Sequence, residues 1–180
     1  MTENVALITT LLSLATLIAD VALVLVAILY LLGKGPQGYL PATLIRPILL
    51  WGSLVALASV VLSLYYSEVV GFEACALCWW QRIFIYPQAI LFFIAWRRSE
   101  YSIWRYTLPL SIFGLFFGFA HWILQTFHFS IIPCTAAGVS PCEKVFFLEF
   151  GYVTFPVMAI TTLLILCVIS LVSRSLERGA

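Results

Sequence analysis

Charged side chains are scarce in this sequence, and their scarcity excludes a water-soluble domain. Charged residues make up 9% of the 180 residues, whereas hydrophobic residues make up 63%. A soluble surface needs roughly a quarter of its residues to be charged, so this chain cannot cover itself in water. With a net charge of only +1, the chain also lacks the basic stripe that nucleic-acid binding requires. The mean hydropathy of +1.10 instead indicates an integral membrane protein.

Long runs with almost no charge predict where the chain crosses the membrane. A helix needs about 20 mostly apolar residues to span roughly 30 Å of hydrocarbon. The runs lack the alternating pattern of a barrel strand, so helices are the expected form. Five runs meet these conditions, at residues 5–32, 47–67, 79–96, 106–127 and 152–172. The sequence therefore predicts an all-α membrane protein with five spans.

These spans divide the chain into three parts. Residues 1–46 contain an extra N-terminal transmembrane helix and the loop that follows it. Residues 47–172 are expected to form a four-helix transmembrane bundle with cysteines in two loops on the same side, and residues 173–180 form a tail. We therefore predict a four-helix bundle with one additional helix at its N-terminus.

The positive charges predict the orientation of the spans. The loops of membrane proteins that face the cytoplasm are enriched in Lys and Arg, of which this chain has nine. Seven of the nine fall on one side of the predicted spans: Lys34, Arg46, Arg97, Arg98, Arg105, Arg174 and Arg178. We expect this side to be cytoplasmic, which places the C-terminus inside, and the N-terminus and both cysteine loops outside.

Four of the five cysteines lie in the two loops that are expected outside the cytoplasm, where disulfides persist. They form two pairs, Cys75 with Cys78 and Cys134 with Cys142. Cys167 lies within the last predicted span and is expected to be a small buried residue. The two pairs are compatible with structural disulfides, a zinc site or a redox relay. The spacing is irregular for zinc, and a CxxC disulfide restrains little chain entropy, so both features favour a relay.

The first pair is a CxxC motif at the expected beginning of the third span. The positive end of a helix dipole and its unpaired amide N–H groups favour the thiolate form of a cysteine placed there. Arg82 follows Cys78 by four residues on the same helical face, so its cation is also expected to favour a thiolate at Cys78. Alternatively, Arg82 is an interfacial anchor beside Trp79 and Trp80.

Several short motifs occur together in a characteristic order. They are CALCWWQRIFIYP at 75–87, Pro-Cys at 133–134 and again at 141–142, and FGYVTFP at 150–156. In this combination the chain resembles the disulfide bond formation protein B family (DsbB), especially its BdbC-like branch, over about residues 46–172. The resemblance implies a thiol oxidase of the prokaryotic cytoplasmic membrane. It also implies that the enzyme reoxidises a soluble thioredoxin-like thiol oxidase (DsbA- or BdbD-like) and passes two electrons to ubiquinone or menaquinone.

The resemblance further assigns roles to individual residues. It implies that Cys134 and Cys142 are the pair that reacts with the dithiol of the partner, and that Cys134 forms the mixed disulfide. Cys75 and Cys78 then receive the electrons. Cys78 is expected beside the quinone, and Arg82 is expected to contact the quinone. A quinone suits this position because it accepts two electrons, as thiol exchange requires, and dissolves in lipid.

Three more polar residues lie in or near the predicted spans. His121 and His128, near the outer end of the fourth span, are candidates for lining the quinone site or for handling its protons, with simple packing as the alternative. Asp20 lies in the middle of the first span without an evident cationic partner. We expect either a functional role for this carboxylate or a protonated, hydrogen-bonded packing role.

The sequence leaves two alternative functions open. One is a vitamin K epoxide reductase-like enzyme, although that family places its CxxC after the loop pair and this chain reverses the order. The other is a non-catalytic membrane subunit with structural disulfides. The extra first span and the short loop between Cys134 and Cys142 also depart from the usual pattern of the resembled family.

Overall fold

The computed structural model describes residues 3–32, 47–127, 142 and 144–179. Five long helices dominate these residues: α1 (Glu3–Leu31), α4 (Ile48–Leu64), α5 (Ala76–Arg98), α6 (Trp104–Phe127) and α7 (Phe155–Gly179). A π-helical turn, η1 (Tyr65–Val69), extends α4, and a short 3-10 turn, η2 (Tyr101–Ile103), precedes α6. With that extension, five helices are long and apolar enough to cross a membrane, which confirms the predicted all-α class and its five spans.

The helix ends follow from local sequence. α5 begins at Ala76, directly after Cys75 and three residues earlier than the predicted span, and it is followed by Ser99, which adopts a left-handed conformation with φ of 53°. α7 begins at Phe155, three residues later than predicted, because Pro156 suits the first turn of a helix. It also continues past the predicted end of the span to Gly179, and in this extension the Arg174 guanidinium lies 4.8 Å from the centroid of the Trp104 ring.

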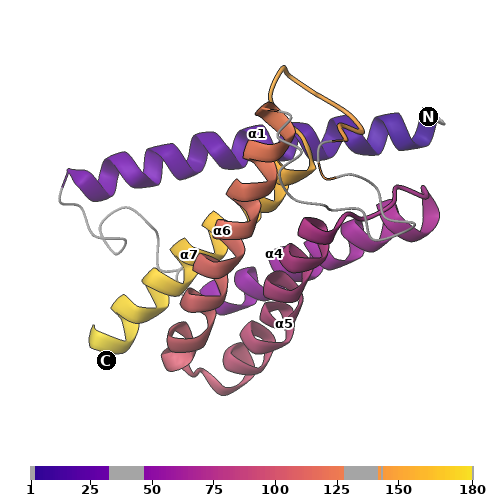
Figure 1. Cartoon of the computed structure of the whole chain (residues 1–180). Helices are drawn as coiled ribbons and strands as arrows, with labels where there is room; N and C mark the ends of the chain where they lie inside the picture. The colour runs from indigo at the N-terminus through magenta and orange to yellow at the C-terminus, as the bar shows by residue number, and fades with distance from the viewer. Residues whose placement is uncertain (1–2, 33–46, 128–141, 143, 180) are drawn as a thin grey trace.

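Four of the helices form a bundle, and α1 lies on its outside. α4 packs against α5 and α7, and α6 packs against α5 and α7. Figure 1 shows α1 crossing this bundle obliquely. In the most apolar stretch of α1 only 6% of the residues are buried, compared with 39% in α5 and in α7. α1 is therefore a peripheral element whose position depends on few contacts.

Glycines allow the bundle helices to approach each other closely. A Cβ atom at Gly114 of α6 would lie 2.7 Å from a methyl group of Leu163 of α7. A Cβ atom at Gly52 of α4 would lie 2.9 Å from the Phe92 ring of α5. Small residues at helix contacts are typical of membrane bundles, in which close packing replaces the hydrophobic drive for association.

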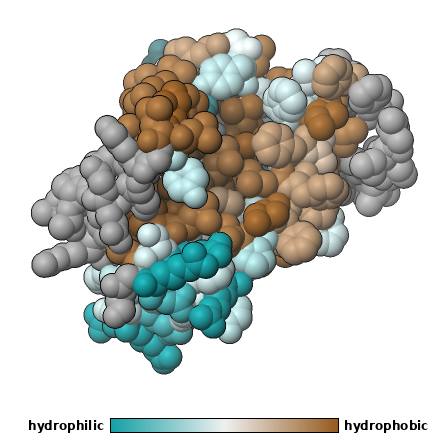
Figure 2. Space-filling view, turned by 90° about the vertical axis from the view of Figure 1, so that its left-hand side faces the viewer, coloured by the Kyte–Doolittle hydropathy of each residue, from teal (hydrophilic) through white to brown (hydrophobic). Residues whose placement is uncertain are grey.

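The CxxC thiols and the arginine pair Arg97 and Arg98 lie at opposite ends of α5. Cys75 is its N-cap, and Arg97 and Arg98 lie in its last turn. A helix of 23 residues is about 35 Å long, which matches the thickness of a bilayer core. Figure 2 shows hydrophilic residues at one end of the molecule and a mostly apolar surface beyond it. Of the cytoplasmic charges predicted from sequence, Lys34 and Arg46 lie outside the described residues.

Candidate redox-active site

Three of the four predicted redox cysteines meet at one end of the bundle. The Sγ atoms of Cys75 and Cys78 are 3.1 Å apart. Cys142 packs with Cys75 and Leu77 in one buried cluster, against which Cys78 also packs. The structure thus brings a member of the second pair into contact with the first pair. Cys134 lies outside the described residues, so its place remains a prediction.

Cys75 is both the cap of α5 and a protonated thiol. Its Sγ accepts a hydrogen bond from the backbone N–H of Cys78 at 3.4 Å. The hydrogen bond between the two sulfurs and the burial of the side chain raise the pKa of Cys75 to about 12, against a smaller opposing effect of His121. At neutral pH, Cys75 therefore keeps its proton, and the sulfur of Cys78 is the acceptor in the pair.

His121 contacts Cys75 through one ring nitrogen. Its Nε2 atom lies 3.7 Å from Cys75 Sγ, and its Nδ1 atom lies 3.1 Å from Gln81 Nε2. An amide nitrogen only donates, so Nδ1 accepts and the neutral ring carries its proton on Nε2, facing the sulfur. The sequence predicted His121 as a cofactor-binding residue; the structure places it beside the thiol that caps α5. His128 lies outside the described residues.

Gln81 was missed by the sequence analysis. Its side chain is 6% exposed and fixes the orientation of the His121 ring. The sequence does contain one signal for this residue, a side-chain amide next to Arg82 in an otherwise apolar helix. A buried amide needs a hydrogen-bond partner, so such a residue is expected to make a specific contact. Which partner it has depends on how α5 packs against α6, and sequence spacing does not report that contact.

Arg82 is buried and has no described carboxylate partner. Its Nε donates to Ser63 Oγ at 2.9 Å, its Nη2 donates to the Ser63 carbonyl oxygen at 3.1 Å, and its guanidinium lies 5.0 Å from the Trp79 ring centroid. Among the described residues, the single ion pair joins Arg105 to Glu177 at the other end of the bundle. With 8% exposure, Arg82 lies inside the protein, which favours an internal role over an interfacial anchor.

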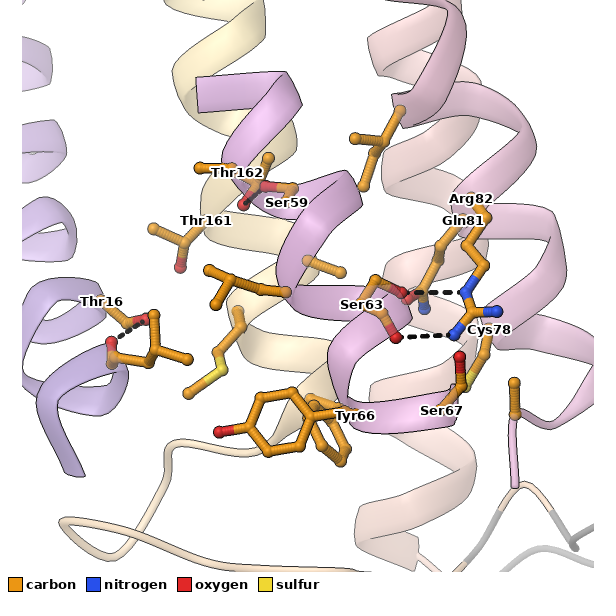
Figure 3. Close-up of a pocket in the computed structure, with 18 of the residues that line it drawn as sticks. Thr16, Ser59, Ser63, Tyr66, Ser67, Cys78, Gln81, Arg82, Thr161 and Thr162 are labelled. Atoms are coloured by element: carbon orange, nitrogen blue, oxygen red, sulfur yellow. Dashed lines mark hydrogen bonds between the residues drawn. The ribbon is translucent and has the colours of Figure 1, made fainter. Parts of the chain in front are cut away.

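Arg82 and Cys78 line a cavity of about 310 Å³ between α1, α4, α5 and α7. Figure 3 shows both side chains on the same side of it, with Arg82 hydrogen-bonded to Ser63. This volume is within the range of about 300–1,000 Å³ that is typical of small-molecule sites. The walls are mainly apolar. The hydroxyl oxygen of Tyr86, which also lines the cavity, is buried and has no hydrogen-bond partner in the part of the chain that the structure describes.

These features fit a quinone. A buried cation and a buried hydroxyl without a partner are both costly unless a ligand supplies acceptor oxygens. A quinone has two carbonyl oxygens on an apolar ring, so Arg82 and Tyr86 are suitable donors and the apolar walls suit the ring. Cys78 also lines a second, smaller pocket together with Cys75, His121 and Cys142. Cys78 therefore borders both the cavity and the pocket that contains Cys142.

A metal is the alternative occupant of the thiol cluster. Donor atoms of Cys75, Cys78 and His121 lie within 4.8 Å of one another, and zinc accepts this set of ligands. Two thiolates on one zinc, each at about 2.3 Å, are separated by about 3.8 Å. The observed 3.1 Å between the sulfurs is shorter, so the arrangement suits direct sulfur–sulfur exchange better than metal binding.

The raised pKa of Cys75 predicts a late alkylation of this thiol. At pH values below 9, its thiolate fraction is expected to be about a thousandfold lower than that of an ordinary cysteine. Labelling of the reduced protein across a pH series, followed by mass spectrometry, is expected to show a Cys75 midpoint near 12. Cys78→Ala removes the main cause of the shift and is expected to lower that midpoint.

The unfolded protein is the control for this experiment, because there both thiols titrate normally. Folded protein in which Cys75 labels with the same pH profile as unfolded protein would contradict the assignment of the proton to Cys75. A Cys78→Ala midpoint equal to that of the unmodified sequence would show that burial alone raises the pKa.

A capped, buried dithiol in contact with a third cysteine, at one end of a five-span bundle, defines a membrane thiol–disulfide oxidoreductase. The family model of the disulfide bond formation protein DsbB matches residues 45–173. The chain belongs to this DsbB family and is a disulfide-forming oxidoreductase of that class. This assignment also replaces the vitamin K epoxide reductase-like alternative.

Individual relatives agree with the family assignment. The chain is 36% identical to a probable disulfide formation protein of Metapseudomonas resinovorans over 136 residues, which cover 74% of this chain and 94% of the relative. It is 34% identical to a probable disulfide formation protein C of Halalkalibacterium halodurans, covering 71% and 93%. It is also 34% identical to disulfide bond formation protein C of Bacillus subtilis, covering 68% and 90%. No solved structure matches the chain.

Proposed function

We propose that this protein oxidises a soluble thioredoxin-like dithiol protein outside the cytoplasm and passes the two electrons to a membrane quinone, ubiquinone or menaquinone. The observation that carries the proposal is the cavity in which Cys78 lies beside a buried arginine that has no carboxylate partner among the described residues. A thiol next to such a cation, within a membrane-embedded apolar cavity, suits electron transfer to a lipid-soluble acceptor.

The first step is exchange between the partner and the loop pair. The dithiol of the partner reduces the Cys134–Cys142 disulfide through a mixed disulfide with Cys134 and leaves as a disulfide itself. The loop pair then carries two thiols, which hold the two electrons and two protons that the partner has lost.

The second step moves the electrons into the bundle. The Cys142 thiolate attacks the Cys75 sulfur of the Cys75–Cys78 disulfide, which releases Cys78 as a thiolate. Cys134 then attacks Cys142, which restores the loop disulfide and releases Cys75. The contact between Cys142 and Cys75 supports this order, and the Nε2–H of His121 is placed to stabilise the departing Cys75 sulfur. Cys75 then takes up a proton, as its raised pKa requires.

The last step uses the cavity. When bound, a quinone supplies the two-electron acceptor that the reduced pair needs, and it becomes a quinol as Cys75 and Cys78 return to a disulfide. Arg82 stabilises the Cys78 thiolate and the negative charge that develops on the acceptor oxygen, an effect that a low dielectric strengthens. The Tyr86 hydroxyl is the second donor available to hold the acceptor.

The charge distribution supports the proposed side of the membrane. In the part of the chain that the structure describes, Arg97, Arg98 and Cys75 lie on one helix, with the arginines at the end opposite the thiol. Positive residues mark the cytoplasmic side of membrane proteins. We therefore place the thiols on the outer face of the prokaryotic cytoplasmic membrane.

Purified protein tests this function directly. Mixed with a reduced thioredoxin-like protein and a quinone analogue, it is expected to form about one partner disulfide for each quinone reduced, because each step transfers two electrons. Without quinone, oxidation is expected to stop once the disulfides already in the enzyme are used. Sustained partner oxidation without quinone, or no quinone reduction, would overturn the proposal. The second result would favour the rival with purely structural disulfides.

A further inference from the structure

The extra helix α1 supplies part of the cavity wall although it lies outside the family model. That model begins at residue 45, and α1 ends at Leu31. Four residues of α1 nevertheless line the cavity: Leu12, Ala15, Thr16 and Ala19. In Figure 3, α1 carries Thr16 on the side of the pocket opposite Cys78 and Arg82. An element that the family pattern does not include thus faces the reactive sulfur across the cavity.

Hydrogen bonds hold α1 in place on both sides of this lining segment. Toward its N-terminus, Thr9 Oγ1 pairs with the Tyr66 hydroxyl at 2.8 Å. Beyond the lining segment, the Asp20 carboxylate accepts hydrogen bonds from Thr161 Oγ1 at 2.6 Å and from the Tyr152 hydroxyl at 3.0 Å. Asp20 is therefore hydrogen-bonded to the bundle, and the choice between its functional role and its packing role stays a prediction.

These hydrogen bonds determine the position of α1 because few other contacts hold this helix against the bundle. Most of its surface is exposed, so apolar burial does not determine its distance from the bundle. Two of the three bonds join α1 to residues beside the cavity, since Tyr66 and Thr161 line it themselves. The polar contacts therefore set how far the lining face of α1 stands from α4 and α7.

Three of the four α1 residues that line the cavity have small side chains. Ala15 and Ala19 are one helical turn apart and lie on the same face, with Thr16 next to them. Larger residues at these positions would occupy space inside the cavity. The width of the cavity on this side is therefore determined by the small size of three neighbouring residues.

We propose that α1 is a specificity wall of the quinone cavity, in which Ala15, Thr16 and Ala19 determine how large a ring the cavity admits. The inference rests on the proposed function, because it assigns a specificity determinant to the same cavity. It predicts that added bulk on this face excludes a two-ring naphthoquinone more strongly than a one-ring benzoquinone.

The test compares two alanines on α1. Ala19 lines the cavity, whereas Ala27 is exposed and does not line it. In purified protein, Ala19→Leu is expected to raise the KM for a naphthoquinone analogue about tenfold or more, with a smaller change for a benzoquinone analogue. Ala27→Leu, the matched control, is expected to leave both KM values unchanged. Exchange between the loop cysteines and a dithiol partner is expected to be equal in all three proteins.

The outcomes separate the inference from the proposed function. If the starting protein reduces quinones and both lining variants, Ala19→Leu and Ala15→Leu, show the same KM values as Ala27→Leu, the wall assignment is overturned. If the starting protein reduces neither analogue, the proposed function itself fails. Ala15→Leu is a second variant at an exposed lining position; a shift in the same direction supports the wall, and its absence in both lining variants refutes it.

Discussion

Cys78→Ser is expected to stop quinone reduction while leaving thiol exchange at the loop pair intact. Cys78 lines both the cavity and the small pocket that contains Cys75 and Cys142, so its sulfur connects the two halves of the reaction. Serine at this position cannot form the disulfide with Cys75. The expected loss of quinone turnover is therefore complete within detection, while Cys134 and Cys142 still oxidise one equivalent of a dithiol partner.

Cys167→Ser is the matched control for this variant. Cys167 lies in α7 and lines neither pocket, so its replacement is expected to leave both half-reactions unchanged. Both half-reactions are measured with purified protein, the first by quinone absorbance and the second by gel-shift labelling of thiols. Stoichiometric quinone reduction by Cys78→Ser would remove Cys78 from the mechanism.

Arg82→Met is expected to lower kcat/KM for quinone by roughly 100- to 1,000-fold, the usual effect of removing one stabilising donor from a charged transition state. Exchange with the soluble partner is expected to change by no more than about twofold, because the loop cysteines react on the other side of Cys78. Arg82→Lys keeps the charge but loses the planar donors, so we expect an intermediate value.

Stability provides a second measurement on the same variant. A buried cation without a carboxylate costs free energy of folding, and its replacement by an apolar side chain of similar length is often neutral or stabilising. Arg82→Met is therefore expected to unfold at the same temperature as the starting protein or at a higher one. Arg105→Met, at an exposed arginine at the far end of the bundle, is the control. Equal losses in both half-reactions would contradict the assigned role of Arg82.

The spans and the reactive residues could be predicted from sequence because each has a local signal. A run of about 20 apolar residues is sufficient to identify a membrane helix. The CxxC motif at the beginning of α5 and the arginine one turn later are likewise neighbours along the chain. The structure places the CxxC motif at the beginning of α5, with Cys75 as the N-cap, and it places Arg82 and Cys78 on one cavity.

Contacts between distant segments could not be predicted in this way. Gln81 and His121 meet only because α5 packs against α6, and Ser63 reaches Arg82 only because α4 packs against α5. The partner of Asp20 on α7, Thr161, is 141 residues away in the chain. Such pairings depend on helix packing, for which a single sequence carries no local pattern.

The position of Cys78 between two pockets has a kinetic consequence under the proposed function. A quinone would reach Cys78 through the cavity, whereas the electrons of the soluble protein would arrive through the loop cysteines and the small pocket that contains Cys75 and Cys142. Neither substrate has to leave before the other arrives, and neither blocks the route of the other. The Cys78 sulfur thus links a reaction in the membrane with a reaction outside it.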